Sequence, residues 1–83
     1  MRGGKPPRVS KVATNFGDVL LDEKRGQYWH LNEAAAVVFT ALSEGRGENE
    51  AALRLVEQYG ISVERARADA ASIAGQMKEN GLL

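Results

Sequence analysis

Short apolar runs alternate with turn-forming residues over the first third of the chain. Residues 8–13, 18–22 and 27–31 carry the β-branched, aliphatic and aromatic side chains that favour strands, in runs of typical strand length. Gly17 marks the turn after the first run. Gly26 follows the second run and can take the left-handed conformation that closes a short hairpin. The pattern predicts three short strands joined by tight turns.

From residue 32 onward, the apolar positions recur at the spacing of a helix face. The first stripe, at i, i+3, i+4 and i+7, consists of Ala35, Val38, Phe39 and Leu42. The second stripe, within residues 48–59, consists of Ala52, Leu55, Val56 and Tyr59. The third stripe consists of Val63, Ala66, Ala70, Ile73 and Met77. These stripes predict three helices, of which the third is the longest.

Residues suited to starting and ending helices flank these stripes. Asn32 and Ser62 precede the first and third stripes, and their side chains can accept a backbone N–H of the first helical turn. Glycines follow the stripes at residues 45, 60 and 81, where helices commonly end. Three strands followed by three helices predict an α+β domain, with the helices on one face of a small antiparallel sheet.

The amino-terminal segment differs from the rest of the chain. Gly3-Gly4 and Pro6-Pro7 favour a flexible tail over residues 1–7, which leaves residues 8–83 as a single domain. No apolar run approaches the roughly 20 residues that cross a bilayer, and the start of the chain lacks a secretory signal. We therefore expect a cytoplasmic location and no membrane partner.

Charge and composition argue against several classes of function. The 11 basic and 11 acidic residues give a net charge of zero, whereas DNA binding relies on Lys and Arg to neutralise phosphates. The chain has no cysteine, which excludes disulfides and thiolate nucleophiles. His30 is the only histidine, no nucleophile motif surrounds any serine, and zinc needs more ligands than the chain offers. We expect no catalytic residue, metal, cofactor or nucleic-acid partner.

The third predicted strand carries a large aromatic side chain on each of its faces. Because strand side chains alternate, Tyr28 and His30 face one way, while Gln27, Trp29 and Leu31 face the other. In a purely structural interpretation, Trp29 and Leu31 fill the core and Tyr28 is partly exposed. In a functional interpretation, Tyr28 and His30 border a binding surface. An edge strand also has unpaired N–H and C=O groups that can accept another strand.

The third predicted helix is unusually rich in alanine over residues 65–74. High helix propensity is one explanation. Small residues beside a sheet edge would also leave a groove wide enough for an extended peptide. Arg65, Arg67 and Asp69 would then form the polar rim of that groove.

Taken in order, these segments resemble the PqqD-like family. The resemblance is carried by Val19-Leu20-Leu21-Asp22, Gly26-Gln27-Tyr28-Trp29-His30-Leu31-Asn32, a capped helix ending near residues 42–45, and the closing segments 59–61 and 81–83. The Gly-x-Tyr-Trp-x-Leu-Asn version is more similar to the stand-alone B1 leader-recognition proteins of lasso-peptide biosynthesis than to the pyrroloquinoline quinone chaperone.

This resemblance implies a winged-helix-like fold that binds the leader segment of a ribosomally made precursor peptide. The leader would add as a strand to the free edge of the third strand and lie against the third helix. The implied peptide-binding residues are Gln27, Tyr28, Trp29, His30, Leu31, Val63, Arg67, Ala70, Ala71 and Ala74. A leader peptidase, the cysteine protease subunit that receives the bound precursor, is the implied partner. The chain is thus expected to be a non-catalytic adaptor and not an enzyme.

Three other functions stay open at this point. A winged-helix DNA-binding domain has the same kinds of elements, so fold alone does not decide. Against it, acids are interleaved with the arginines of the third helix, as in Glu64-Arg65 and Arg67-Ala68-Asp69. The other two are a PqqD-type peptide chaperone of pyrroloquinoline quinone biosynthesis and a structural subunit whose aromatic edge forms a permanent protein interface.

Overall fold

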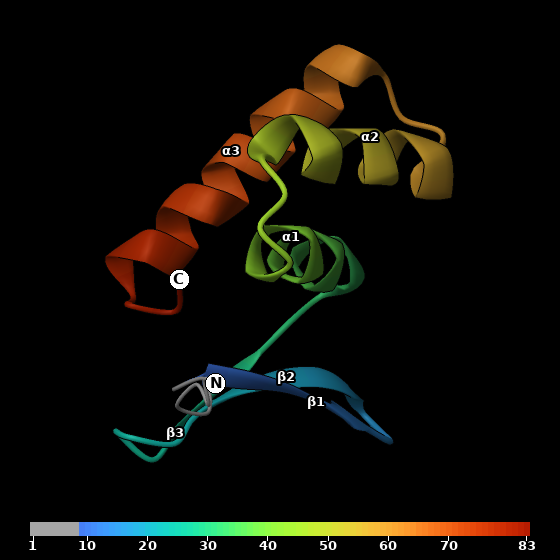
Figure 1. Ribbon diagram of the computed structural model, residues 1–83. Coiled ribbons are helices and arrows are strands. Elements are labelled where there is room, and N and C mark those ends of the chain that lie inside the picture. Colours follow the sequence, from blue (N-terminus) through green and yellow to red (C-terminus); the bar gives the residue numbers. More distant parts are fainter. Residues whose placement is uncertain (1–8) are drawn as a thin grey trace, which may run out of the picture.

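The computed structural model describes residues 9–83, which form a three-stranded antiparallel sheet followed by three helices (Figure 1). The strands are β1 (Val9–Thr14), β2 (Gly17–Asp22) and β3 (Gln27–His30). β2 lies in the middle, so β1 and β3 are both edge strands. The three predicted strands are confirmed to within a residue at each described end. Arg8 and the tail predicted over residues 1–7 lie outside the described residues.

Two tight hairpins set the pairing of the strands. In the first, Thr14 is opposite Gly17, and in the second, Asp22 is opposite Gln27. Gly26 has a φ of 68° and donates its N–H to the Asp22 carbonyl at 2.7 Å, so the predicted left-handed glycine is confirmed. The second hairpin places Leu20 opposite Trp29, on the sheet face that the helices cover.

The helices are α1 (Glu33–Ser43), α2 (Glu48–Tyr59) and α3 (Val63–Glu79). Both predicted caps are confirmed: the Asn32 side chain accepts the Ala35 N–H at 2.7 Å, and the Ser62 hydroxyl accepts the Arg65 N–H at 3.1 Å. Over residues 9–83, none of the helices has the length and apolar character needed to span a bilayer.

The helices lie on one side of the sheet, with α1 directly over it and α2 and α3 stacked beyond α1 (Figure 1). Two groups of buried side chains hold these layers together. The helical cluster consists of Val38, Ala41, Ala51, Ala52, Leu55, Ala66 and Ala70. The sheet-side cluster consists of Leu20, Phe39, Met77 and Leu82. The end of α3 therefore packs near β3 and helps to cover the sheet.

Candidate functional site

β3 directs half of its backbone groups toward β2 and half toward its free edge. The Leu31 N–H donates to the Asp18 carbonyl at 3.0 Å, so residue 31 points toward β2. Backbone direction alternates along an antiparallel strand, so Gln27 and Trp29 share this orientation. Tyr28 and His30 therefore point their N–H and C=O groups toward the free edge. The sequence alone left open which of the two sets faces outward.

The side chains of β3 divide between the two faces of the sheet as predicted. Trp29 and Leu31 are partly buried against the sheet-side cluster, which agrees with the structural interpretation of these residues. Tyr28 is 71% exposed, and His30 and Gln27 are also exposed. Tyr28 is thus free of the core, as the functional interpretation requires.

A groove with about 210 Å³ of space lies between the end of β3 and α3, and we call it the edge groove. One wall is formed by Trp29, His30, Leu31 and Asn32, and the facing wall by Ile73, Gln76, Met77 and Asn80. The indole N–H of Trp29 is buried and has no hydrogen-bond partner among residues 9–83. A strand edge, a helix wall with both polar and apolar side chains, and a buried indole donor therefore lie close together here.

The helix residues predicted for this site lie elsewhere on α3. Ala70 and Ala74 are fully buried, and Ala70 belongs to the helical cluster. Val63 is at the start of the helix and 45% exposed, while Arg67 and Ala71 are exposed to solvent. None of these five residues lines the edge groove. The side of α3 that borders the edge groove instead carries Ile73, Gln76, Met77 and Asn80, and peptide contact by the five helix residues stays a prediction.

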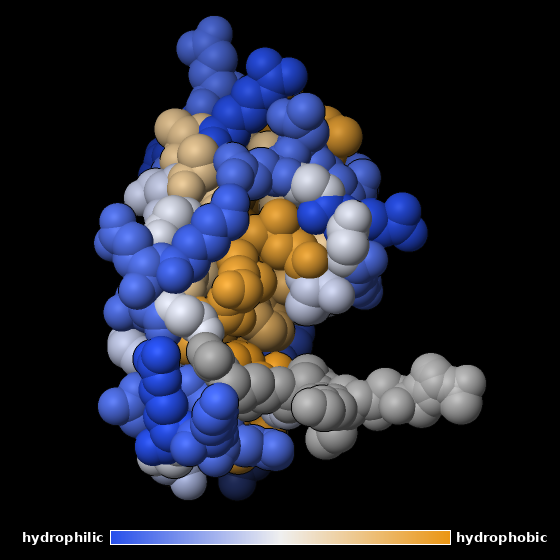
Figure 2. Space-filling model, turned by 60° about the vertical axis from the view of Figure 1, so that its left-hand side comes forward, coloured by the Kyte–Doolittle hydropathy of each residue, from blue (hydrophilic) through white to orange (hydrophobic). Residues whose placement is uncertain are grey.

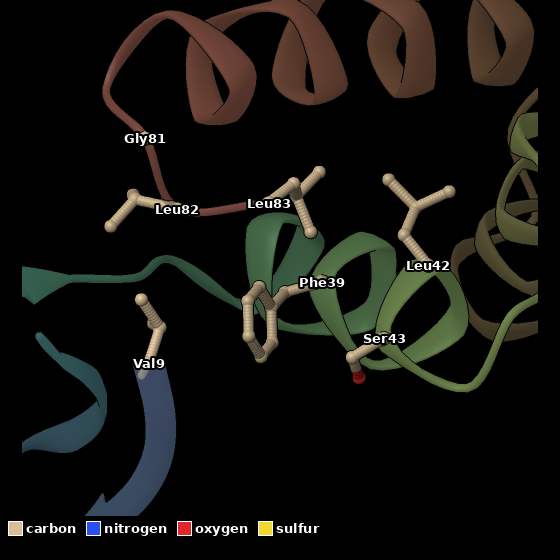
Figure 3. A pocket seen from close by; sticks show the side chains of 7 residues that line it. All are labelled: Val9, Phe39, Leu42, Ser43, Gly81, Leu82 and Leu83. Carbon is tan, nitrogen blue, oxygen red and sulfur yellow. The ribbon is translucent and has the colours of Figure 1, made fainter. Parts of the chain in front are cut away.

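A larger cleft lies apart from the free edge of β3. This terminal cleft, with about 500 Å³ of space, is lined by Val9, Phe39, Leu42, Ser43, Gly81, Leu82 and Leu83. Leu42 and Leu83 point toward one another across it (Figure 3). Figure 2 shows an apolar hollow framed by polar side chains on this side of the molecule. Leu82 lines both the terminal cleft and the edge groove.

A third cleft, the junction cleft, has about 420 Å³ of space where the three helices meet. It is lined by Asn32, Glu33, Ala34, Leu55, Tyr59, Ile61, Arg65 and Asp69. Burial, together with the nearby Glu33 carboxylate, raises the pKa of the Tyr59 phenol above its ordinary value. Arg65 lies 3.8 Å from the Asp69 carboxylate. The cleft thus has a polar, charged rim.

Comparisons with known proteins agree with this architecture. Residues 18–83 match the family described as coenzyme PQQ synthesis protein D (PqqD). Among curated proteins, no sequence match is found. A solved lasso peptide synthetase B1, complexed with the leader peptide, is 36% identical with a TM-score of 0.79, over 92% of this chain and 89% of that one.

A second solved structure, TbiB1 in complex with the TbiA(beta) leader peptide, is 19% identical with a TM-score of 0.79. The match spans 94% of this chain and 91% of that one, and at this identity it shows a shared fold. The resemblance inferred from the motifs around β3 is confirmed, as is the predicted fold class. The chain belongs to the PqqD family.

Proposed function

We propose that this chain binds the leader segment of a ribosomally made, lasso-type precursor peptide by strand addition to β3. The observation that carries the proposal is the juxtaposition of a free backbone edge with the edge groove. Tyr28 and His30 direct their N–H and C=O groups toward an edge that no other strand of residues 9–83 pairs with, and α3 forms a second wall beside them. The 36%-identical synthetase B1 was solved with a leader peptide, which supports the same ligand class here.

In this geometry, backbone groups and side chains have different roles in peptide binding. Main-chain hydrogen bonds at Tyr28 and His30 provide affinity for any extended peptide. Alternate side chains of the peptide then enter the edge groove, where Trp29 and Leu31 face Ile73 and Met77. On α3, Ile73, Gln76, Met77 and Asn80 line the edge groove and join residues 27–31 in the proposed peptide-binding set, while the five helix residues named from the sequence stay a prediction.

The buried indole of Trp29 adds a reason for peptide to bind here. A buried donor without a partner costs about 1–3 kcal/mol. A peptide carbonyl that reached the Trp29 N–H would remove this cost, because the donor has no partner among the described residues. The edge groove would in that way favour a peptide backbone over a purely apolar ligand.

The chain acts in this proposal as a non-catalytic adaptor that delivers the bound precursor to a leader peptidase. The chain contains no cysteine, so cleavage by a cysteine protease requires a separate protein. We place this step in the cytoplasm, where ribosomally made precursors first become available. Residues 8–83 constitute the adaptor domain.

The proposal is tested by titrating the chain with a synthetic leader peptide from the precursor encoded beside its gene. Trp29 is the only tryptophan and lines the edge groove, so its fluorescence reports binding directly. His30→Pro removes a backbone donor at the free edge, where proline is tolerated. We expect a folded variant that binds the leader at least about tenfold more weakly, the loss of roughly one hydrogen bond.

His30→Ala is the matched control, because it removes the side chain and keeps the backbone donor. Tyr28→Pro provides a second variant at the same edge, and Trp29→Pro, on the side facing β2, should unfold the domain. Normal leader binding by folded His30→Pro and Tyr28→Pro variants would rule out strand addition. Salt-sensitive binding to duplex DNA, with the leader inert, would favour the DNA-binding alternative.

A further inference from the structure

One face of α3 lines both the edge groove and the junction cleft. Arg65, Asp69, Ile73, Gln76 and Asn80 are separated by the intervals that place residues on a single side of a helix. The first two line the junction cleft and the last three line the edge groove. Asn32, between β3 and α1, lines both clefts. The two clefts are therefore consecutive parts of one track along α3.

This track is longer than the strand beside it. From residue 65 to residue 80, an α-helix rises about 22 Å, at 1.5 Å per residue. An extended peptide covers that distance with about seven residues. β3 has 4 residues, so a peptide lying along the whole track extends about three residues beyond the strand. Those residues reach the junction cleft.

The direction of strand addition decides which end of the peptide these residues come from. All strand pairs in the sheet are antiparallel, so a guest strand continues that pattern when it runs antiparallel to β3. β3 runs from Gln27 toward Asn32, so the amino-terminal side of the guest lies near Asn32. The peptide residues that precede the paired stretch are thus the ones that enter the junction cleft.

The junction cleft has a floor and a rim of different chemistry. Leu55 is 1% exposed and forms the apolar floor together with Ala34 and Ile61. On the rim, the Arg65 guanidinium is close to Asp69, whereas Glu33 has no cationic partner among the ion pairs found over residues 9–83. Two carboxylates and one guanidinium leave the rim with a net negative charge.

We propose that the junction cleft is a second subsite for the leader, occupied by residues on the amino-terminal side of the β-paired stretch. The apolar floor of the cleft accepts an apolar side chain of the leader, and Glu33 pairs with a Lys or Arg next to it in the leader sequence. This inference rests on the proposed leader-binding function and adds to it a preference for sequence beyond the strand. Charge complementarity at Glu33 is the feature that makes the preference measurable.

The test combines two leader peptides with three forms of the full chain. The peptides are the complete synthetic leader and a version shortened by the residues that precede the paired stretch. The protein forms are the wild type, Glu33→Gln, and the control Glu64→Gln, which removes an exposed carboxylate of α3 that lines neither cleft. Dissociation constants are measured by calorimetry at low and physiological salt.

We expect the shortened leader to bind the wild type about tenfold more weakly than the complete leader. Glu33→Gln should weaken binding of the complete leader about three- to fivefold, more at low salt, and leave the shortened leader unaffected. Glu64→Gln should match the wild type with both peptides. A leader whose basic residue in this segment is replaced by glutamine should reproduce the Glu33→Gln effect.

The outcomes separate this inference from the function on which it rests. If no leader binds, or if His30→Pro binds it normally, the proposed function fails. If the leader binds and His30→Pro weakens it, while shortening and Glu33→Gln have no effect, only the second subsite is overturned. The subsite is also overturned if the Glu33 effect disappears on shortening the opposite, carboxyl-terminal side of the leader.

Discussion

The helical cluster and the sheet-side cluster are built from side chains of very different size. The helical cluster is mostly alanine, with Val38 and Leu55 as its larger members, and it allows the three helices to approach closely. The sheet-side cluster consists of the long or aromatic side chains of Leu20, Phe39, Met77 and Leu82. The terminal cleft and the edge groove both open beside this second cluster, and Leu82 lines the two of them.

This difference separates the part of the molecule that holds the fold from the part that can receive a ligand. Small side chains at close helix contacts leave little freedom, because any added volume forces the backbone apart. Long, unbranched side chains such as Met77 adapt their shape more easily. The proposed peptide site therefore lies beside the adaptable side chain of Met77, next to a closely packed bundle of helices.

The largest expected effect on stability comes from a substitution that disrupts the sheet-side cluster. Leu20 is fully buried and lies opposite Trp29 on the neighbouring strand, so Leu20→Ala should leave a cavity and lower the free energy of unfolding by about 2–5 kcal/mol. Urea unfolding measures the loss. Leu53→Ala is the control, because Leu53 is 49% exposed on α2 and its truncation should have little effect. Similar losses for both variants would contradict the placement of Leu20.

An intermediate effect is expected in the helical cluster. Ala70 is fully buried, and Ala70→Leu should overpack the contact between helices and destabilise the fold by about 1–3 kcal/mol. Ala71→Leu, one residue away on the exposed side, should change stability by no more than about 0.5 kcal/mol. A stable Ala70→Leu variant with impaired leader binding would instead show that Ala70 faces the peptide.

The smallest effects are expected at Tyr28 on β3 and at Leu31, the residue that follows this strand. The two side chains lie on opposite faces of the sheet. Leu31 is partly buried, so Leu31→Ala should cost about 1–2 kcal/mol, below the range for a fully buried leucine. Tyr28→Ala should change stability by about 0.5 kcal/mol or less and weaken leader binding a few-fold through lost cross-strand contact. Thermal melting and leader titration distinguish the two, and equal thermal losses would contradict this assignment.

The elements of the fold were predictable because their boundaries depend on local chemistry. Asn32 and Ser62 cap helices through their own side chains, and Gly26 turns the hairpin through a backbone conformation that glycine tolerates best. Each of these signals acts over a few residues, so the sequence displays it directly. The aromatic third strand was recognisable for the same reason.

The helix wall of the site was not predictable, because alanine fits both a core and a groove. Ala66, Ala70 and Ala74 face the interior, whereas Ala71, in the same run, is exposed. The wall of the edge groove carries the larger Ile73 and Met77 beside the polar Gln76. The outward direction of Tyr28 and His30 depends on a hydrogen bond between distant residues, Leu31 and Asp18, which side-chain patterns do not reveal.

The β2–β3 hairpin also determines the register in which a guest peptide pairs with β3. Asp22 is fully buried, and its carboxylate accepts the Arg25 N–H at 3.2 Å while its carbonyl accepts the Gly26 N–H, so the turn ties β3 to a single alignment. A slip of one residue would send every side chain of a strand to the opposite face. For a leader paired with β3, the hairpin therefore acts as the start of a reading frame. It selects which alternate residues of the precursor are presented to the groove and which to solvent.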